Sequence, residues 1–93
     1  MVNTMEEKKK QKPRKGDQIR FWAMNEWTGA NTLMIGKVLG FGDAVRKMWP
    51  TQMAHAPNDY LLVQRIVHGV KSLYAVIPED VDSIISTLFE KEN

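Results

Sequence analysis

This chain of 93 residues has three tryptophans, and two of them stand close to basic side chains. Trp22 follows Arg20 by two positions, and Trp49 follows Lys47 by two positions. Basic side chains of this kind bind phosphate oxygens, and exposed aromatic rings stack on unpaired bases. Tryptophan and arginine also supply much of the binding energy at protein–protein interfaces. The chemistry that these residues offer is therefore recognition, either of nucleic acid or of another protein.

We expect the binding surface to combine these rings with basic residues from several segments. Trp27 lies in a polar loop and Trp49 precedes Pro50, so both are expected to be exposed. For Trp22 the sequence allows either a core or a surface position. A single basic residue is most simply a solvated surface charge, and a single aromatic residue is often part of a core. The predicted binding surface therefore depends on the whole group of residues and not on any one of them. The candidate residues are Arg20, Trp22, Trp27, Lys37, Arg46, Lys47, Trp49 and Arg65, with Lys71 beside them.

Catalytic chemistry fits this sequence poorly. His55 and His68 lie on different predicted loops, and neither has a carboxylate at the spacing of a helical metal site. The glycines of "GKVLGFG" lack the Lys-Ser/Thr of a P-loop and the pattern of a dinucleotide-binding turn. The absence of cysteine excludes a disulfide, a thiolate zinc site and a cysteine nucleophile. We therefore expect a protein that is not an enzyme and that has no metal or other cofactor.

The charge of the chain is unevenly distributed, with its positive charge at the beginning. Residues 79–93 carry five acidic residues against one basic residue, and residues 16–93 as a whole have a net charge of −2. Residues 1–15 are expected to form a disordered basic arm, which keeps the protein soluble or attracts phosphates without sequence specificity. The cations of this electrostatic arm are Lys8, Lys9, Lys10, Lys12, Arg14 and Lys15.

The apolar residues occur in runs too short to span a membrane, and no apolar stretch follows the early lysines as it does in a signal peptide. We therefore expect a cytoplasmic protein without a membrane partner. An apolar fraction of 43% is sufficient for one small globular domain, which we place at residues 16–93.

Short alternating segments predict that this domain is mainly β. Residues 18–24 alternate with the period of a strand, and the second strand, at 32–41, contains two glycines that indicate a bend or a bulge. The clearest strand spans 60–67, and the turn "HGVK" joins it to a partner strand. The residues expected to face the core are Ile19, Phe21 and Ala23 in the first strand and Leu33, Ile35, Leu39 and Phe41 in the second.

Two segments are predicted with helical character. Residues 43–58 fit either one short helical turn or a strand, and Pro50 ends both. Residues 79–91 are expected to form a C-terminal α-helix, because the acidic residues suit a helix start and the apolar residues repeat at helical spacing. The stripe is Val81, Ile84, Ile85 and Leu88, to which Phe89 adds an adjacent apolar residue.

The segments "KGDQIRF", "IGKVLGF", "YLLVQRI" and "LYAVIPEDV" resemble the strand series of SH3-like barrels, particularly the KOW and Tudor-like varieties. The resemblance covers roughly residues 15–82 and implies a small, strongly bent antiparallel barrel; the alternative is an open antiparallel sheet with a helix packed across it. Residues 43–58 are longer than the usual connection. No complete aromatic cage can be assigned, so the resemblance does not imply recognition of methylated lysine.

The first functional hypothesis is a small non-catalytic module that binds RNA or single-stranded DNA, or associates with nucleic acid. The negative charge of residues 16–93 argues against broad binding of duplex DNA. The second hypothesis is a protein-interaction module, a small regulator or inhibitor of the bacterial or phage type that docks on a larger protein. The third is a structural subunit of a larger assembly.

Overall fold

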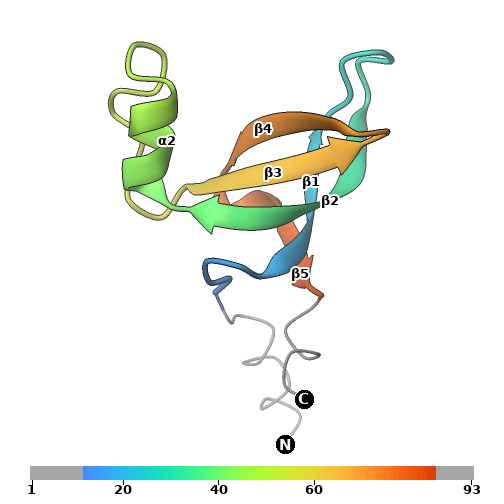
Figure 1. Ribbon diagram of the computed structural model, residues 1–93, viewed down its shortest axis with the longest axis horizontal. Coiled ribbons are helices and arrows are strands. Elements are labelled where there is room, and N and C mark those ends of the chain that lie inside the picture. The colour runs from blue at the N-terminus through green and yellow to red at the C-terminus, as the bar shows by residue number, and fades with distance from the viewer. Residues whose placement is uncertain (1–11, 86–93) are drawn as a thin grey trace, which may run out of the picture.

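The structure, a computed structural model, describes residues 12–85 and confirms a mainly β protein. Five strands pair antiparallel in the order β4-β3-β2-β1-β5. One α-helix follows β2, and a 3₁₀ turn precedes β5 (Figure 1). The elements are β1 (Gln18–Met24), β2 (Asn31–Gly40), α2 (Gly42–Met48), β3 (Leu61–Val67), β4 (Val70–Val76), η1 (Pro78–Asp80) and β5 (Val81–Ile84).

The longest strand, β2, belongs to both halves of the sheet. Its first part pairs with β1 as far as Lys37, and its end pairs with β3 from Lys37 onward. The register shifts between Val38 and Gly40, an irregularity of the kind that bends a strand. The sheet is therefore strongly bent, with the inward faces of its strands turned toward one another (Figure 1). Its two edges are β4 and β5, so the closed barrel expected from the sequence is not formed within residues 12–85.

The inward faces of the strands enclose the main core. Ile19 and Phe21 of β1 are fully buried, which confirms the face predicted for the first strand. The ring of Phe21 meets that of Tyr74 edge to face, with centroids 5.6 Å apart. Residues from four strands therefore share one apolar interior. The buried members of the main core are Ile19, Phe21, Met34, Val38, Leu61, Val63 and Val76.

The predicted orientation of the second strand is wrong for Leu33 and Ile35, whereas Phe41 packs partly buried against the main core as predicted. Leu33 and Ile35 are exposed, whereas Met34, Val38 and the intervening glycine face the core. A Cβ atom on Gly36 would lie 2.6 Å from Val63 Cγ1 and close to the ring of Phe21. Glycine is buried here because the neighbouring side chains fill the space that its own side chain would need.

A second apolar cluster lies under α2 on the outward surface of the sheet. Val45 of α2 is fully buried against Leu62 of β3 and Ala56 of the following loop. The ambiguous segment 43–58 is thus a helix and a loop that cover the sheet. Trp49 packs partly buried against this cluster, so the prediction that Trp49 is exposed is wrong.

The predicted helix over residues 79–91 is wrong for Val81–Ile84, which form β5. Pro78 does open a helical turn, but η1 has only three residues, and Ile19 and Phe21 of β1 then pair with β5. Val81 and Ile84 pack against the main core from this strand, because β1 offers an unpaired edge that β-branched residues cover well. The rest of the predicted helix, residues 86–91, lies outside the described residues.

The predicted basic arm falls mostly on residues 1–11, which lie outside the described part. Residues 12–15 belong to the described part and are joined to the sheet, because the Gly16 amide donates to the Val38 carbonyl oxygen at 2.8 Å. A turn closed by the Asp17 amide and the Arg14 carbonyl precedes β1. Over residues 12–85, no helix has the length and apolar character needed to cross a membrane.

Candidate functional site

The structure distributes the predicted binding residues over three places. Arg20, Trp22 and Lys37 lie on the outward surface of β1 and β2. Trp27 and Arg65 line a groove at the end of the sheet that lies away from α2 (Figure 1). The remaining residues, Arg46, Lys47 and Trp49, belong to α2 and the loop after it. The eight residues therefore do not form one continuous patch.

The outward side chains of β1 and β2 form a continuous surface, which we call the outer patch. Trp22 pairs with Leu33 across the two strands, and Arg20 pairs with Ile35. Directly opposed residues in an antiparallel pair have Cβ atoms about 5 Å apart, so their side chains are neighbours on one face. The outer patch consists of Arg20, Trp22, Met24, Leu33, Ile35 and Lys37.

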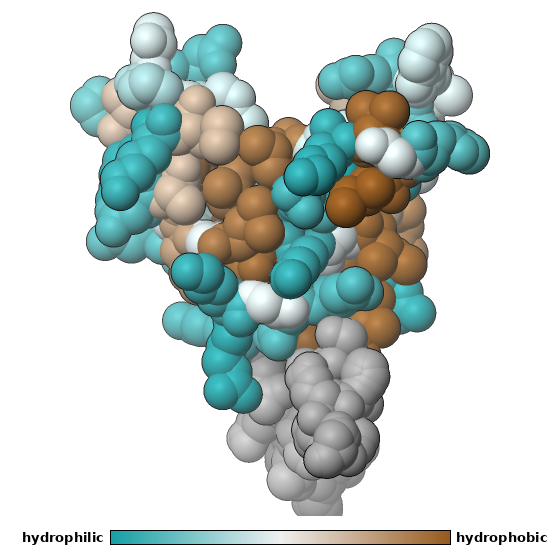
Figure 2. All heavy atoms as spheres, viewed as in Figure 1, coloured by the Kyte–Doolittle hydropathy of each residue, from teal (hydrophilic) through white to brown (hydrophobic). Residues whose placement is uncertain are grey.

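The outer patch exposes much apolar surface. Trp22 is 39% exposed, Ile35 51% and Met24 63%. Figure 2 shows apolar side chains open to solvent at the end of the sheet where the β1–β2 and β3–β4 turns both lie, bordered by hydrophilic side chains. Arg20 borders the patch on the side of β5, where its Nη1 atom donates to Ser83 Oγ at 3.2 Å. Contiguous exposed apolar side chains of this kind are typical of interaction sites.

The second surface is a groove of about 460 Å³ between the β1–β2 loop and the β3–β4 hairpin, which we call the hairpin groove. Both turns lie at the same end of the sheet (Figure 1). The groove has aromatic, aliphatic and polar walls. It is lined by Asn25, Glu26, Trp27, Met34, Arg65, Val67, His68, Val70, Ser72 and Tyr74.

Local turn chemistry positions the two walls of the hairpin groove. Asn25 Oδ1 accepts hydrogen bonds from the amides of Trp27 (2.8 Å) and Thr28 (3.2 Å), which fixes the loop that carries Trp27. On the opposite wall, His68 and Gly69 have positive φ angles of 53° and 79°. Two consecutive positive φ values are characteristic of the type I′ hairpin turn, whose twist matches that of its strands. The turn predicted at "HGVK" is therefore confirmed.

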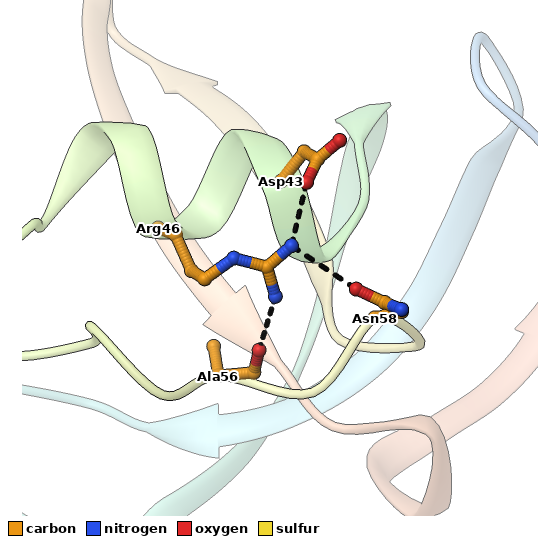
Figure 3. A network of polar contacts seen from close by, with 4 residues as sticks. All are labelled: Asp43, Arg46, Ala56 and Asn58. Carbon is orange, nitrogen blue, oxygen red and sulfur yellow. Dashed lines mark hydrogen bonds and ion pairs between the residues drawn. The ribbon is translucent and has the colours of Figure 1, made fainter.

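Arg46 points into a network that fastens the long loop to α2 (Figure 3). Its Nη1 atom donates to the Ala56 carbonyl oxygen, and its Nη2 atom donates to Asp43 Oδ1 and to Asn58 Oδ1, the latter at 3.0 Å. The guanidinium thus uses its donors inside the protein. Arg46 is a structural residue in this arrangement, and we remove it from the binding set.

Replacing Arg46 with methionine should lower the free energy of unfolding by about 2 kcal/mol, since hydrogen bonds to a charged group are lost and two acceptors on the loop lose their partner. Urea unfolding followed by tryptophan fluorescence measures this change. Lys47→Met is the matched control, because Lys47 is exposed on the same helix and its replacement should change stability by less than about 0.5 kcal/mol. Equal stabilities of the two variants would contradict a structural role for Arg46.

Sequence reasoning missed several residues of both surfaces. Leu33 and Ile35 were expected in the core, and their exposure depends on glycine taking the inward positions of β2. Tyr74 and Ser72 join the hairpin groove only because the turn register places them beside Arg65. The tight turn "HGVK" is the sequence signal that fixes this register.

Among residues 12–85, no group of three or more histidine, aspartate or glutamate side chains is placed to hold a metal ion. The outer patch and the hairpin groove are the two surfaces that hold the predicted binding residues of the strands and of the β1–β2 loop. The chain matches no protein-family model, no curated protein and no solved structure, so its function rests on the geometry of these two surfaces.

Proposed function

We propose that this protein is a non-catalytic interaction module that docks on a larger protein through the outer patch. The observation that carries the proposal is the group of exposed apolar side chains around Trp22, which β1 and β2 hold in a fixed register. A rigid sheet face loses little conformational freedom on binding, and tryptophan is among the commonest hot-spot residues.

The composition of the outer patch favours a protein over nucleic acid as the partner. Leu33, Ile35 and Met24 are exposed beside Trp22. Surfaces that bind nucleic acid are more polar and much more positively charged than surfaces that bind protein. Three exposed aliphatic side chains gain binding energy when a protein covers them, whereas a phosphate backbone provides no apolar surface for them.

The charges that border the outer patch indicate what kind of protein fits it. Arg20 and Lys37 belong to the patch, and among the described residues it contains no carboxylate. A partner with an apolar centre and an acidic rim would match this arrangement, since complementary charges steer and orient association. A second copy of this chain fits less well, because pairing the patch with itself brings like charges together.

We also propose that the bent sheet is an opened variant of an SH3-like barrel. The support is the strand order β4-β3-β2-β1-β5 together with η1, which lies in the "IPEDV" segment of the resemblance and leads β5 onto β1. This fold proposal is compatible with docking, because a binding function needs only one outer surface of the sheet and no catalytic residues.

The test is affinity purification with the immobilised full chain, followed by titration of each captured protein in purified form. We expect a partner that stays bound when salt is raised, and whose affinity falls at least thirtyfold with Trp22→Ala, which corresponds to about 2 kcal/mol. Trp27→Ala is the matched control, because Trp27 is exposed outside the outer patch and should leave this affinity unchanged. Loss of the captured protein when salt is raised, or an affinity that is unchanged in Trp22→Ala, would contradict docking through the outer patch.

Nucleic-acid binding is the second candidate function, and the exposure of Trp27 favours it. Trp27 is 93% exposed at the tip of a loop, where a base can stack on its ring. The test is a titration of tryptophan fluorescence with single-stranded RNA, single-stranded DNA and duplex DNA at two salt concentrations. A variant with the six arm cations replaced by glutamine separates the arm from the folded surface. Quenching that persists in this variant and disappears in Trp27→Ala would favour this function.

A further inference from the structure

Arg65 has a donor that nothing in the described protein satisfies. Arg65 lines the hairpin groove, and its Nε atom is shielded from solvent without a hydrogen-bond partner among residues 12–85. Buried donors are nearly always satisfied in native proteins, because the lost hydration is not otherwise replaced. Since Arg65 lines an open groove, an acceptor bound there satisfies this N–H once the guanidinium turns toward it.

The surroundings of Arg65 define the chemistry of that acceptor. Ser72 lies directly across from Arg65 in the β3–β4 register, and Tyr74 and Trp27 bring aromatic rings to the same groove. A guanidinium presents its N–H groups as a planar fork, which matches the two oxygens of a carboxylate. Glu26 also lines the groove but forms no ion pair with Arg65.

We propose that the hairpin groove binds a peptide carboxylate through Arg65, with the residue next to the carboxylate packed against Trp27 and Tyr74. Beside its polar residues, the groove offers one arginine together with aromatic and aliphatic side chains, which suits a single negative charge attached to an apolar side chain. A phosphate backbone requires several cations along its path, and no lysine lines this groove. The proposal does not depend on the outer patch, which lies on the outward surface of β1 and β2.

The volume of the groove, about 460 Å³, lies within the range of small-ligand sites. It accommodates one or two residues of a peptide rather than a long segment. The carboxylate has two sources, an aspartate or glutamate side chain or the free C-terminus of a chain. The same fork contact serves both, so the probes must separate them.

The experiment is a ¹H–¹⁵N titration of the full chain, in which the Arg65 Nε–H resonance is assigned by its loss in Arg65→Lys. The probes are the capped peptide acetyl-Ala-Phe-Glu-Ala-amide, its glutamine counterpart, and acetyl-Ala-Phe-Ala with a free C-terminus. We expect a saturable shift of the Arg65 Nε–H signal with a Kd of about 1 mM, and at least tenfold weaker binding of the glutamine peptide. A preference between the two carboxylate peptides identifies the source.

Variants separate the groove from the outer patch. Arg65→Lys keeps the charge but loses the planar fork, and should weaken binding of the carboxylate peptide at least tenfold in a titration followed by tryptophan fluorescence. Arg20→Lys is the matched control on the outer patch and should leave the affinity unchanged. The Arg46 Nε–H resonance reports that each variant remains folded, because the Nη1 and Nη2 atoms of the same guanidinium are held by the internal network.

Three results would overturn the proposal. The first is equal binding of the glutamate and glutamine peptides, and the second is the absence of any saturable shift at about 10 mM peptide. The third is tighter binding of a dinucleotide than of the carboxylate peptides at physiological salt, which would make the groove a nucleotide site. Since Trp22 takes no part in this test, its failure leaves docking through the outer patch unaffected.

Discussion

Replacing Phe21 with alanine will lower the free energy of unfolding by about 3–5 kcal/mol, the largest stability loss that we expect from one substitution. Phe21 is fully buried at the centre of the main core. The truncation removes its apolar surface from the core, leaves a cavity and abolishes the edge-to-face contact with Tyr74. Because a small domain is stable by only about 5–15 kcal/mol, the variant will be extensively unfolded at moderate temperature.

Urea unfolding monitored by far-ultraviolet circular dichroism measures the effect, with Phe21→Leu as a milder step that keeps the protein folded. Trp22→Ala provides a matched comparison, since it removes an aromatic ring from the adjacent, outward position of the same strand. We expect Trp22→Ala to cost about 1–2 kcal/mol, clearly less than Phe21→Ala, because Trp22 already exposes 39% of its surface. Similar losses in the two variants would contradict the inward and outward faces assigned to β1.

The second large effect is expected at Gly42, where substitution by alanine will destabilise the protein by about 3 kcal/mol. A Cβ atom at this position would meet the backbone of the long loop, 2.5 Å from Asn58 Cα and in conflict with the carbonyl oxygen of Pro57. These are backbone atoms, so relief requires the loop to move away from α2. The Gly42 amide also donates to the Asn58 carbonyl oxygen at 3.2 Å, and that hydrogen bond would be strained.

The direction of this change is informative, because alanine is intrinsically a better helix residue than glycine by about 1 kcal/mol. If α2 and the loop were not packed together, Gly42→Ala would raise the melting temperature. Lys47→Ala, at an exposed position of the same helix, is the control and should be neutral or slightly stabilising. Differential scanning calorimetry of both variants decides between the two outcomes.

The sequence was sufficient to predict strands that alternate in the simplest way. Ile19 and Phe21 are large, apolar and two positions apart, and they are buried as expected. In β2 the assumption that large apolar residues two positions apart face the core predicted the wrong side for Leu33 and Ile35. It does not identify a glycine as a core residue. Gly36 is inward for a steric reason that exists only once Phe21 and Val63 are packed beside it.

Long-range pairing explains the other differences. The apolar stripe after Pro78 fits a helix when considered locally, but Val81 and Ile84 gain more by completing the edge of β1. For the hairpin groove, the sequence predicted Arg65 and Trp27 as binding residues but not that they would line the same groove. Arg65 and Trp27 are far apart in the sequence and meet only because two hairpins end at the same side of the sheet.

The pairing of β1 with β5 has a consequence for how the protein folds. The β1–β2 and β3–β4 hairpins join segments close in sequence, whereas Ile19 and Ile84 meet from nearly opposite ends of the described chain. Contacts that close so long a loop form slowly, because the entropy of closure must be overcome first. On a ribosome, β1 would therefore emerge early and keep one unpaired edge until β5 is synthesised. Over that interval a chaperone or a neighbouring nascent chain has access to the same edge.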